Sequence, residues 1–289
     1  MYKLPIGILF MLTSFISLAQ EQTTSLSNKQ QRKLRPKYMQ VGMGFNRGAV
    51  QDFATSPITY KGLLFNYSLA RLNMDSKKEV KAGVRFNHGK YGYSREEGIP
   101  VATNASAYLL FLNYYSLYRI NRWSNDKWNI KLGGAFDVVG DLRINSAFMN
   151  AAVGFEVFNT LALSGKATRV FRRDHAVDKK LWFIKYQLKP TVRTLSYRFN
   201  VPVVNGYYRN GYAYVREGSL TAGYQYKLFS GVRLNSELAY THQMQNGNMW
   251  RASYFWDAYT TGGDHNRFEM ANHIFEFSIL FHLNKTVQP

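Results

Sequence analysis

The chain has 289 residues, of which 37 are Lys or Arg, 18 are Asp or Glu and none is Cys, so its formal charge is +19. The lack of Cys excludes a disulfide framework, a thiolate zinc site and an iron–sulfur cluster. A content of 46% hydrophobic and 16% aromatic residues excludes a disordered chain.

The first predicted segment is a secretory signal peptide at 1–19. Lys3 provides a positive start, residues 4–18 form an apolar run, and Ala19 is a small residue suited to cleavage before Gln20. The apolar run of ~15 residues is shorter than the ~20 that a spanning helix needs, so a membrane anchor is the less favoured alternative. Secretion argues against nucleic acid as a partner, although the isoelectric point is near 9.9.

Residues 20–37 predict a flexible basic periplasmic tail. This segment is rich in Gln, Ser, Thr and Lys, and Leu26 and Leu34 are its only sizeable apolar residues. It therefore cannot bury enough apolar surface to order itself. A solvated leader to the first strand is the favoured interpretation, and contact with anionic lipid or a partner is the alternative.

Residues 38–284 predict an all-β fold, because apolar and polar residues alternate along run after run. In the run 80–87, Val84 and Phe86 lie on one face and Lys81 and Arg85 on the other, as in a half-buried strand. Strands of this kind are expected, with boundaries uncertain by ~2 to 4 residues, near 38–46, 60–72, 79–91, 105–120, 127–138, 147–158, 160–172, 180–189, 191–200, 213–228, 231–245 and 271–284. The pattern predicts an antiparallel transmembrane β-barrel of about twelve strands. Ten is the alternative count, because the join at Asn159 is the weakest.

The connections alternate between long and short, as they do in outer-membrane barrels. With the amino terminus in the periplasm, long extracellular connections are expected at 47–59, 92–104, 139–146, 173–179, 201–212 and 246–270. Short periplasmic ones are expected at 73–78, 121–126, 159, 189–191 and 229–230. Trp123, Trp128 and Tyr118 flank one short turn and predict an aromatic girdle on the periplasmic side.

These features together resemble an outer-membrane β-barrel protein of a diderm bacterium. The resemblance covers residues 38–284, ends in a strand that carries Phe281, and leaves 285–289 as a C-terminal extension. It implies a monomeric transmembrane barrel in the bacterial outer membrane, preceded by a signal peptide. No motif of a specific family is present, so the resemblance assigns no functional residues. A soluble β-sandwich or lipocalin-like barrel is the alternative.

The residues expected to face the lumen carry mostly positive charge. The predicted basic lining consists of Lys81, Arg85, Lys131, Lys185, Lys189, Arg198, Lys227 and Arg233, against the acids Asp137, Glu156, Glu237 and Glu276. An open lumen with a two-to-one excess of bases would favour small anionic solutes. The leading prediction is therefore a narrow anion-preferring pore or solute-uptake channel. If instead the bases pair with the acids, the barrel is closed and acts as a structural or docking component of an envelope or secretion assembly.

Two further segments suggest surface contacts. Basic residues bracket an expected extracellular connection and would contact anionic glycolipid of the outer leaflet: Arg169, Arg172, Arg173, Lys179 and Lys180. The expected loop 246–270 holds five aromatics that form a possible contact surface: Trp250, Tyr254, Phe255, Trp256 and Tyr259. Extension of the barrel as an added hairpin arm is the favoured interpretation of this segment, and inward folding as a constriction or a contact surface for a glycan or protein partner are the alternatives.

A lipid-modifying enzyme is the weakest prediction. Such chemistry needs a hydroxyl, a base and an orienting group within reach of one another, and the nearest cluster in sequence is Asn87-His88 with Ser94. An interfacial His at a strand end is the favoured explanation of His88. No pattern predicts a metal site or a cofactor, and no catalytic residue is assigned.

Overall fold

The computed structural model describes residues 35–54, 56–93, 103–146, 153–210, 224–261 and 267–283. Within these ranges the chain forms β-strands and one short 3₁₀ helix, η1 (Asn121–Trp123). The strands are β1 (Lys37–Asp52), β2 (Ser56–Met74), β3 (Lys78–Tyr93), β4 (Thr103–Arg119), β5 (Trp128–Ile144), β6 (Val153–Arg173), β7 (Val177–Leu181), β8 (Ile184–Leu188), β9 (Thr191–Asn210), β10 (Tyr224–Leu228), β11 (Val232–Gln243), β12 (Met249–Thr261) and β13 (Phe268–His282). The signal-peptide prediction, most of the tail and the C-terminal extension fall outside the described residues.

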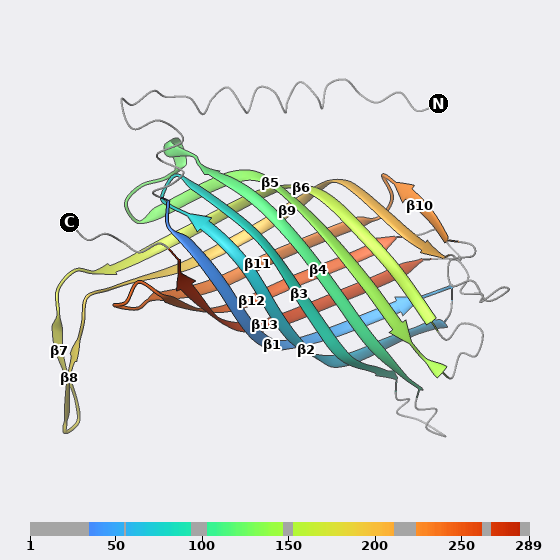
Figure 1. Cartoon of the computed structure of the whole chain (residues 1–289), viewed down its shortest axis with the longest axis horizontal. Helices are drawn as coiled ribbons and strands as arrows, with labels where there is room; N and C mark the ends of the chain where they lie inside the picture. The colour runs from blue at the N-terminus through green and yellow to red at the C-terminus, as the bar shows by residue number, and fades with distance from the viewer. Residues whose placement is uncertain are drawn as a thin grey trace. The chain divides into compact units, whose positions relative to one another are not determined.

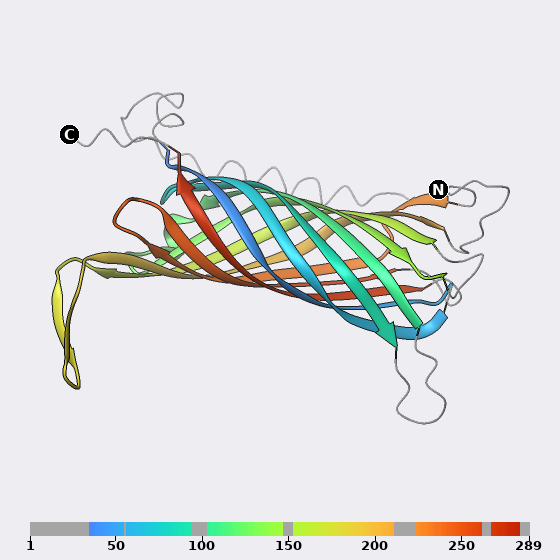
Figure 2. The ribbon, with the colours of Figure 1, turned by 60° about the horizontal axis from the view of Figure 1, so that its bottom comes forward.

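The sheet closes on itself, with every pair of neighbouring strands antiparallel (Figures 1 and 2). Around the ring the order is β1, β2, β3, β4, β5, β6, β9, β11, β12 and β13, and β13 pairs back with β1. The fold is therefore a closed ten-stranded barrel, which is the alternative count from the sequence. Tyr38 near the start of β1 pairs with His282 at the end of β13. We call the end of the barrel that holds this pair the terminal end, and the opposite end the loop end.

Three of the twelve expected strands do not exist as separate barrel strands. The two runs around Asn159 form a single strand, β6, which pairs without a break at this residue with β5. The run 180–189 falls in the β7–β8 hairpin, which forms its own two-stranded sheet. The run 213–228 ends in β10, and the run 231–245 corresponds to β11. Both strands pair with the same neighbour, β9, each with a different end of it.

The break between β10 and β11 is a local distortion rather than a turn between two barrel strands. Phe229 and Gly231 have φ angles of 55° and 78°. A Cβ atom at Gly231 would lie 2.7 Å from the carbonyl oxygen of Thr260, so glycine is required there for space as well as for its φ angle. The chain thus bends while both pieces stay hydrogen-bonded to β9.

The expected long loop at 246–270 is wrong, because most of it is strand β12. Residues 249–261 pair with β11 on one side and with β13 on the other. Its aromatic residues follow the same two-residue alternation as the rest of the barrel, so the segment extends the barrel, as the favoured interpretation predicts, and does not form a contact surface. The connection to β11 is the short turn around Gly247, whose φ is 81°.

The outer face of the barrel is apolar along most of its height. Exposed large apolar side chains point outward from nine of the ten wall strands, all but β12, and examples are Val41, Met43, Phe45, Leu63, Phe65, Leu69, Phe86, Leu110, Leu112, Phe136, Leu161, Leu163, Leu195, Val201, Leu238, Phe275, Phe277 and Ile279. Trp123 and Trp128 are exposed at the terminal end, 58% and 41% respectively, where an aromatic girdle was predicted.

The wall strands have 12 to 21 residues, more than the ~9 to 11 that a tilted strand needs to cross a bilayer. A closed barrel also satisfies every ladder hydrogen bond internally, as lipid requires. The architecture is that of a bacterial outer-membrane β-barrel. Separately, no helix among the described residues is long and apolar enough to span a membrane.

Candidate functional site in the barrel interior

The interior of the barrel is filled with polar, charged and aromatic side chains. Among the described residues, eight buried bases face eight buried acids. The bases are Lys81, Arg85, Lys131, Lys166, Arg198, Arg209, Arg233 and Arg251, and the acids are Asp52, Glu79, Asp137, Asp141, Glu156, Glu237, Asp257 and Glu276. Buried charges are tolerated when they are paired and hydrogen-bonded, so the near balance of charge is itself a condition for this interior to form.

On the terminal side, Glu79 of β3 holds two bases. Its carboxylate lies 2.6 Å from Lys166 Nζ and 3.6 Å from Lys131 Nζ. The hydroxyl of Tyr115 also donates to Glu79, at 2.8 Å. Because Lys131, Lys166 and Tyr115 belong to β5, β6 and β4, this one carboxylate ties together strands that follow one another around the wall.

At mid-height a second cluster reaches across the lumen. Glu276 of β13 lies 3.2 Å from Arg85 Nε of β3, and Glu237 of β11 lies 3.1 Å from an Arg198 terminal nitrogen. Lys81 of β3 reaches Glu237 at 4.0 Å. Here β3 and β11 stand on opposite sides of the ten-strand ring, so the charged side chains of facing walls meet.

Arg251 contributes a further positive charge to this mid-height cluster. Its Nε donates to the hydroxyl of Thr241 at 3.1 Å, and its side chain is buried in the interior. The cluster therefore consists of four bases and two acids: Lys81, Arg85, Arg198, Arg251, Glu237 and Glu276.

Toward the loop end the acids outnumber the bases. Arg143 contacts Asp52 at 3.2 Å, Asp141 at 3.4 Å and Glu156 at 2.7 Å. Arg209 of β9 reaches Asp52 of β1 at 2.7 Å, so these two strands are linked through the interior. Arg143 and Arg209 also both make cation–π contacts with the ring of Phe268. Their Cζ atoms lie 4.9 and 5.0 Å from the centre of this ring.

Between these clusters lie two further acids, Asp137 and Asp257. Asp137 accepts hydrogen bonds from neutral amides, and Asp257 accepts one from a charged guanidinium. Arg233 Nε donates to Asp257 at 2.8 Å. The amides of Asn200 and Asn235 donate to Asp137 at 3.3 and 3.2 Å.

Aromatic side chains complete the filling. Phe111 of β4 and Phe255 of β12 come from opposite sides of the ring, and their ring centres are 6.3 Å apart, edge to face. Phe158 of β6 packs against Tyr259 of β12 and Phe268 of β13, at 4.2 and 5.2 Å. Side chains of facing walls are therefore in van der Waals contact near the barrel axis.

Five of the eight predicted lining bases lie in the interior: Lys81, Arg85, Lys131, Arg198 and Arg233. The other three assignments are corrected. Lys185 lies on β8, outside the barrel sheet. Lys189 is exposed beside the hairpin, and Lys227 is exposed on β10. The four predicted interior acids, Asp137, Glu156, Glu237 and Glu276, are all buried.

The sequence prediction missed the residues that balance the charge. The predicted interior set lacks several acids, most of them near strand ends, and several bases in segments whose strands were not predicted correctly. These residues are Asp52, Glu79, Asp141, Asp257, Lys166, Arg209 and Arg251. The two-residue alternation of β3 does place Glu79 on the same face as Lys81 and Arg85, so the signal for that acid was present. Asp257 and Arg251 lie within the predicted loop 246–270, so they are not among the predicted interior residues, although both fall on the inward positions of the alternation in β12.

The aromatic contact surface predicted at 250–259 is divided between the two faces of the wall. Phe255 and Tyr259 are buried in the interior, 6% and 3% exposed. Trp250, Tyr254 and Trp256 lie on the alternate positions, which face outward. The five residues therefore do not form one surface.

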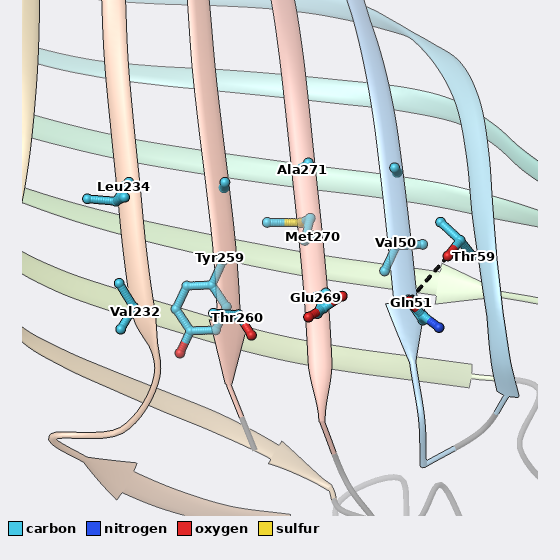
Figure 3. Close-up of a pocket in the computed structure, with 12 residues that line it drawn as sticks. Val50, Gln51, Thr59, Val232, Leu234, Tyr259, Thr260, Glu269, Met270 and Ala271 are labelled. Atoms are coloured by element: carbon cyan, nitrogen blue, oxygen red, sulfur yellow. Dashed lines mark hydrogen bonds between the residues drawn. The ribbon is translucent and has the colours of Figure 1, made fainter. Parts of the chain in front are cut away.

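A groove lies at the loop end where β11, β12, β13, β1 and β2 run side by side (Figure 3). It has a volume of about 340 Å³. Its lining combines small residues such as Ala49 and Ala271 with the buried Tyr259 and Met270, and Thr59 donates to Gln51 at its rim at 3.2 Å. Its walls carry no base and one acid, Glu269, whose partner is Arg267.

The described neighbours of His88 are aromatic rings. His88 lies on β3 at a position that alternates with the interior residues, and its ring is 5.7 to 5.9 Å from those of Phe65, Tyr67 and Phe86 on the outer face. Ser94 lies outside the described residues. In the part of the chain that the structure describes, no group of three His, Cys, Asp or Glu side chains is arranged to hold a metal ion.

The chain matches no protein-family model, and no curated protein is similar to it in sequence. Solved outer-membrane barrels are similar in architecture. The translocator domain of the autotransporter NalP from Neisseria meningitidis is 10% identical, with a TM-score of 0.35 over 96% of this chain and 95% of that one. An outer membrane channel of Pseudomonas putida F1 is 8% identical (TM-score 0.34, 91% and 100% covered), and the attachment invasion protein Ail of Yersinia pestis is 9% identical (0.32, 86% and 100%). Likenesses this distant say nothing about what the chain does, which has to be argued from its own interior.

Proposed function

We propose that this protein is a closed outer-membrane barrel that serves as a structural or docking component of the cell envelope rather than as a solute pathway. The observation that carries the proposal is contact between opposite walls. Phe111 meets Phe255, and Lys81 meets Glu237, each across the full ring of strands. Small barrels are commonly filled in this way, and only larger ones leave an aqueous channel.

A narrow anion-preferring pore is the second candidate, and one observation favours it. The mid-height cluster has two more bases than acids, so a small anion passing that level would meet net positive charge. Balanced charge over the whole interior argues against a general anion preference. Small anionic solutes are partners only under this second candidate, whereas an envelope protein is the partner expected under the first.

Single-channel conductance in a planar bilayer distinguishes the two. The folded wild-type protein is expected to give no stable current. The double variant Phe111→Ala/Phe255→Ala, which removes the contact between opposite walls, is expected to conduct. The matched control is Leu110→Ala/Leu112→Ala on the same strand, because these side chains face outward and are 42% and 45% exposed.

A stable wild-type current with anion preference, reduced in Lys81→Ala/Arg251→Ala, would reject the closed barrel in favour of the pore. Reversal potential in a salt gradient gives the preference. Heat-modifiable migration on a gel verifies that each variant is folded before it is measured.

We infer no enzymatic role. The lipid-modifying alternative depends on His88, which stands among aromatic rings of the outer face. Lipid turnover by the purified protein is expected to be at background and unchanged in His88→Ala. Turnover that disappears in this variant would restore the enzymatic alternative.

A further inference from the structure

The β7–β8 hairpin lies outside the barrel and takes no part in filling it. It connects β6 to β9 at the terminal end and forms a separate two-stranded sheet. In both views it turns away from the long axis of the barrel (Figures 1 and 2). The basic residues around it had been assigned to an extracellular connection, but they lie at the end of the barrel where the described chain begins and ends.

The tip of the hairpin consists of two exposed aromatic residues. Trp182 and Phe183 connect the two strands and are 86% and 82% exposed. Trp182 has a φ angle of 53°, in the left-handed region that bulky side chains rarely adopt. Tight hairpin turns are usually made of Asn and Gly, which adopt this region at little cost. A Trp-Phe turn therefore costs conformational energy and exposes apolar surface, which indicates that the tip is covered when the protein is in place.

The register of the hairpin makes it amphipathic. Val177 pairs with Leu188 and Leu181 pairs with Ile184. Because neighbouring positions alternate between faces, Val177, Lys179 and Leu188 share one face of the hairpin. The opposite face carries Asp178, Lys180 and Gln187. A two-stranded hairpin by itself is marginally stable in water, so its apolar face calls for a surface to rest on.

The wall strands place the root of the hairpin close to the membrane surface. Arg169 of β6 pairs with Trp128, an exposed girdle residue, and β6 ends four residues later at Arg173. Four residues extend about 13 Å along a strand, or about 10 Å along the membrane normal at the usual strand tilt. The chain therefore leaves the barrel wall, at Arg173, close to the level of the lipid headgroups, and β7 begins four residues further on, at Val177.

The charge of the segment fits an anionic surface. Residues 172–189 contain six Lys or Arg and two Asp, and Lys179, Lys180 and Lys189 are exposed. Arg172 contacts Asp174 at 3.9 Å, and both are solvent-exposed, so this pair neutralises little. Interfacial anchors combine aromatic side chains with Lys or Arg in the same way.

We propose that the β7–β8 hairpin is a membrane-surface anchor that binds the anionic phospholipid leaflet at the terminal end. Trp182 and Phe183 enter the interface between headgroups and acyl chains, and Lys179 and Lys180 pair with lipid phosphates. Lipid is favoured over a protein partner because the chain leaves the barrel wall close to headgroup level, the hairpin turns away from the barrel axis, and its exposed lysines fit an anionic surface. The proposal is independent of whether the lumen conducts.

The absence of Cys in the chain allows a direct test. A fluorophore attached to Phe183→Cys in the full-length protein reports the environment of the tip, and Ser76→Cys in the β2–β3 turn of the same barrel end is the matched control. Each is reconstituted in nanodiscs of phosphatidylcholine or of phosphatidylcholine with phosphatidylglycerol. Quenching by lipids that carry a nitroxide near the headgroup measures contact with the leaflet.

Strong quenching is expected at Phe183→Cys in the anionic nanodiscs, with little at Ser76→Cys. Adding Lys179→Gln and Lys180→Gln to Phe183→Cys is expected to weaken lipid contact by about fivefold per charge removed. Heat-modifiable migration shows that the barrel is intact in each case. A tip that is no more quenched than Ser76→Cys would overturn the anchor and leave the hairpin free for a protein partner. Equal quenching in the two kinds of nanodisc would overturn the assignment to anionic lipid.

Discussion

Single residues in the interior are held by partners from other strands, so their individual contributions depend on those partners. Arg233 and Asp257 illustrate this, because they are 2% and 0% exposed and lie 2.8 Å apart. Gly42 of β1 shows the steric side of the same packing. A Cβ atom there would lie 2.8 Å from a carboxylate oxygen of Glu276, so the mid-height cluster needs a residue without a side chain at this position.

Removing one member of the buried pair is expected to cost more than removing both. Arg233→Ala leaves the carboxylate of Asp257 buried without its partner, which should lower the free energy of unfolding by about 3 to 5 kcal/mol. Arg233→Met/Asp257→Leu should cost much less, because no charge is then left behind. The urea midpoint of unfolding in detergent measures both.

The solvent-exposed pair Arg267–Glu269 provides the comparison, with side chains 53% and 34% exposed. Arg267→Ala should change stability by less than about 1 kcal/mol. A similar loss for Arg233→Ala and Arg267→Ala would contradict the view that burial decides the cost.

At the scale of elements, alternation determines what each strand presents to lipid and to the interior. β13 shows it most clearly, since Phe275, Phe277 and Ile279 face outward and Ile274 and Glu276 face inward. β9 departs from strict alternation near Pro202, where the pairing with β6 shifts register between Leu161 and Ala162. A bulge tolerates Pro and changes which residues face inward. Beyond it, counting every second residue no longer identifies the residues that face the interior.

Strand β12 can be tested with two neighbouring small residues. Ala252 faces outward and is exposed, whereas Ser253 is buried at 8%. A lipid-soluble maleimide should label Ala252→Cys in the folded protein in liposomes and should leave Ser253→Cys unlabelled, with mass spectrometry as the readout. Labelling of both by a water-soluble maleimide would mean that this segment is a loop after all.

At the scale of the whole molecule, closure of the sheet is what makes the barrel stable in lipid, because an open sheet would expose unpaired backbone groups. The charge balance of the interior is also a property of the whole ring. Each ionic cluster contains residues from several strands. No single strand carries all the charged residues of a cluster.

Two deletions of similar length should therefore behave differently. Removing 249–261 deletes β12 and leaves β11 and β13 without a partner, so heat-modifiable migration should be lost. Removing 177–188 deletes the hairpin, but β6 and β9 still pair directly as far as Arg173 and Thr191. That variant should remain heat-modifiable, and a barrel that survives the first deletion but not the second would refute the topology.

The class of fold can be predicted from the sequence alone, because a two-residue period repeated over many long runs is compatible with few structures other than a membrane barrel. It also identified Lys81, Arg85, Arg198 and Glu237 as inward positions, since each lies within a regular strand. It did not determine the number of strands. Asn159 resembles a turn residue, yet β6 passes through it because β5 and β9 pair with it on both sides.

Which charged side chains meet in the interior depends on the closed sheet as a whole. The predicted excess of positive charge disappeared once the acids at strand ends and on β12 were placed beside the bases, as with Asp257 and Arg233. Which side chains meet across a barrel depends on the number of strands and on their stagger. These are properties of the closed sheet, and no single segment of the sequence carries them.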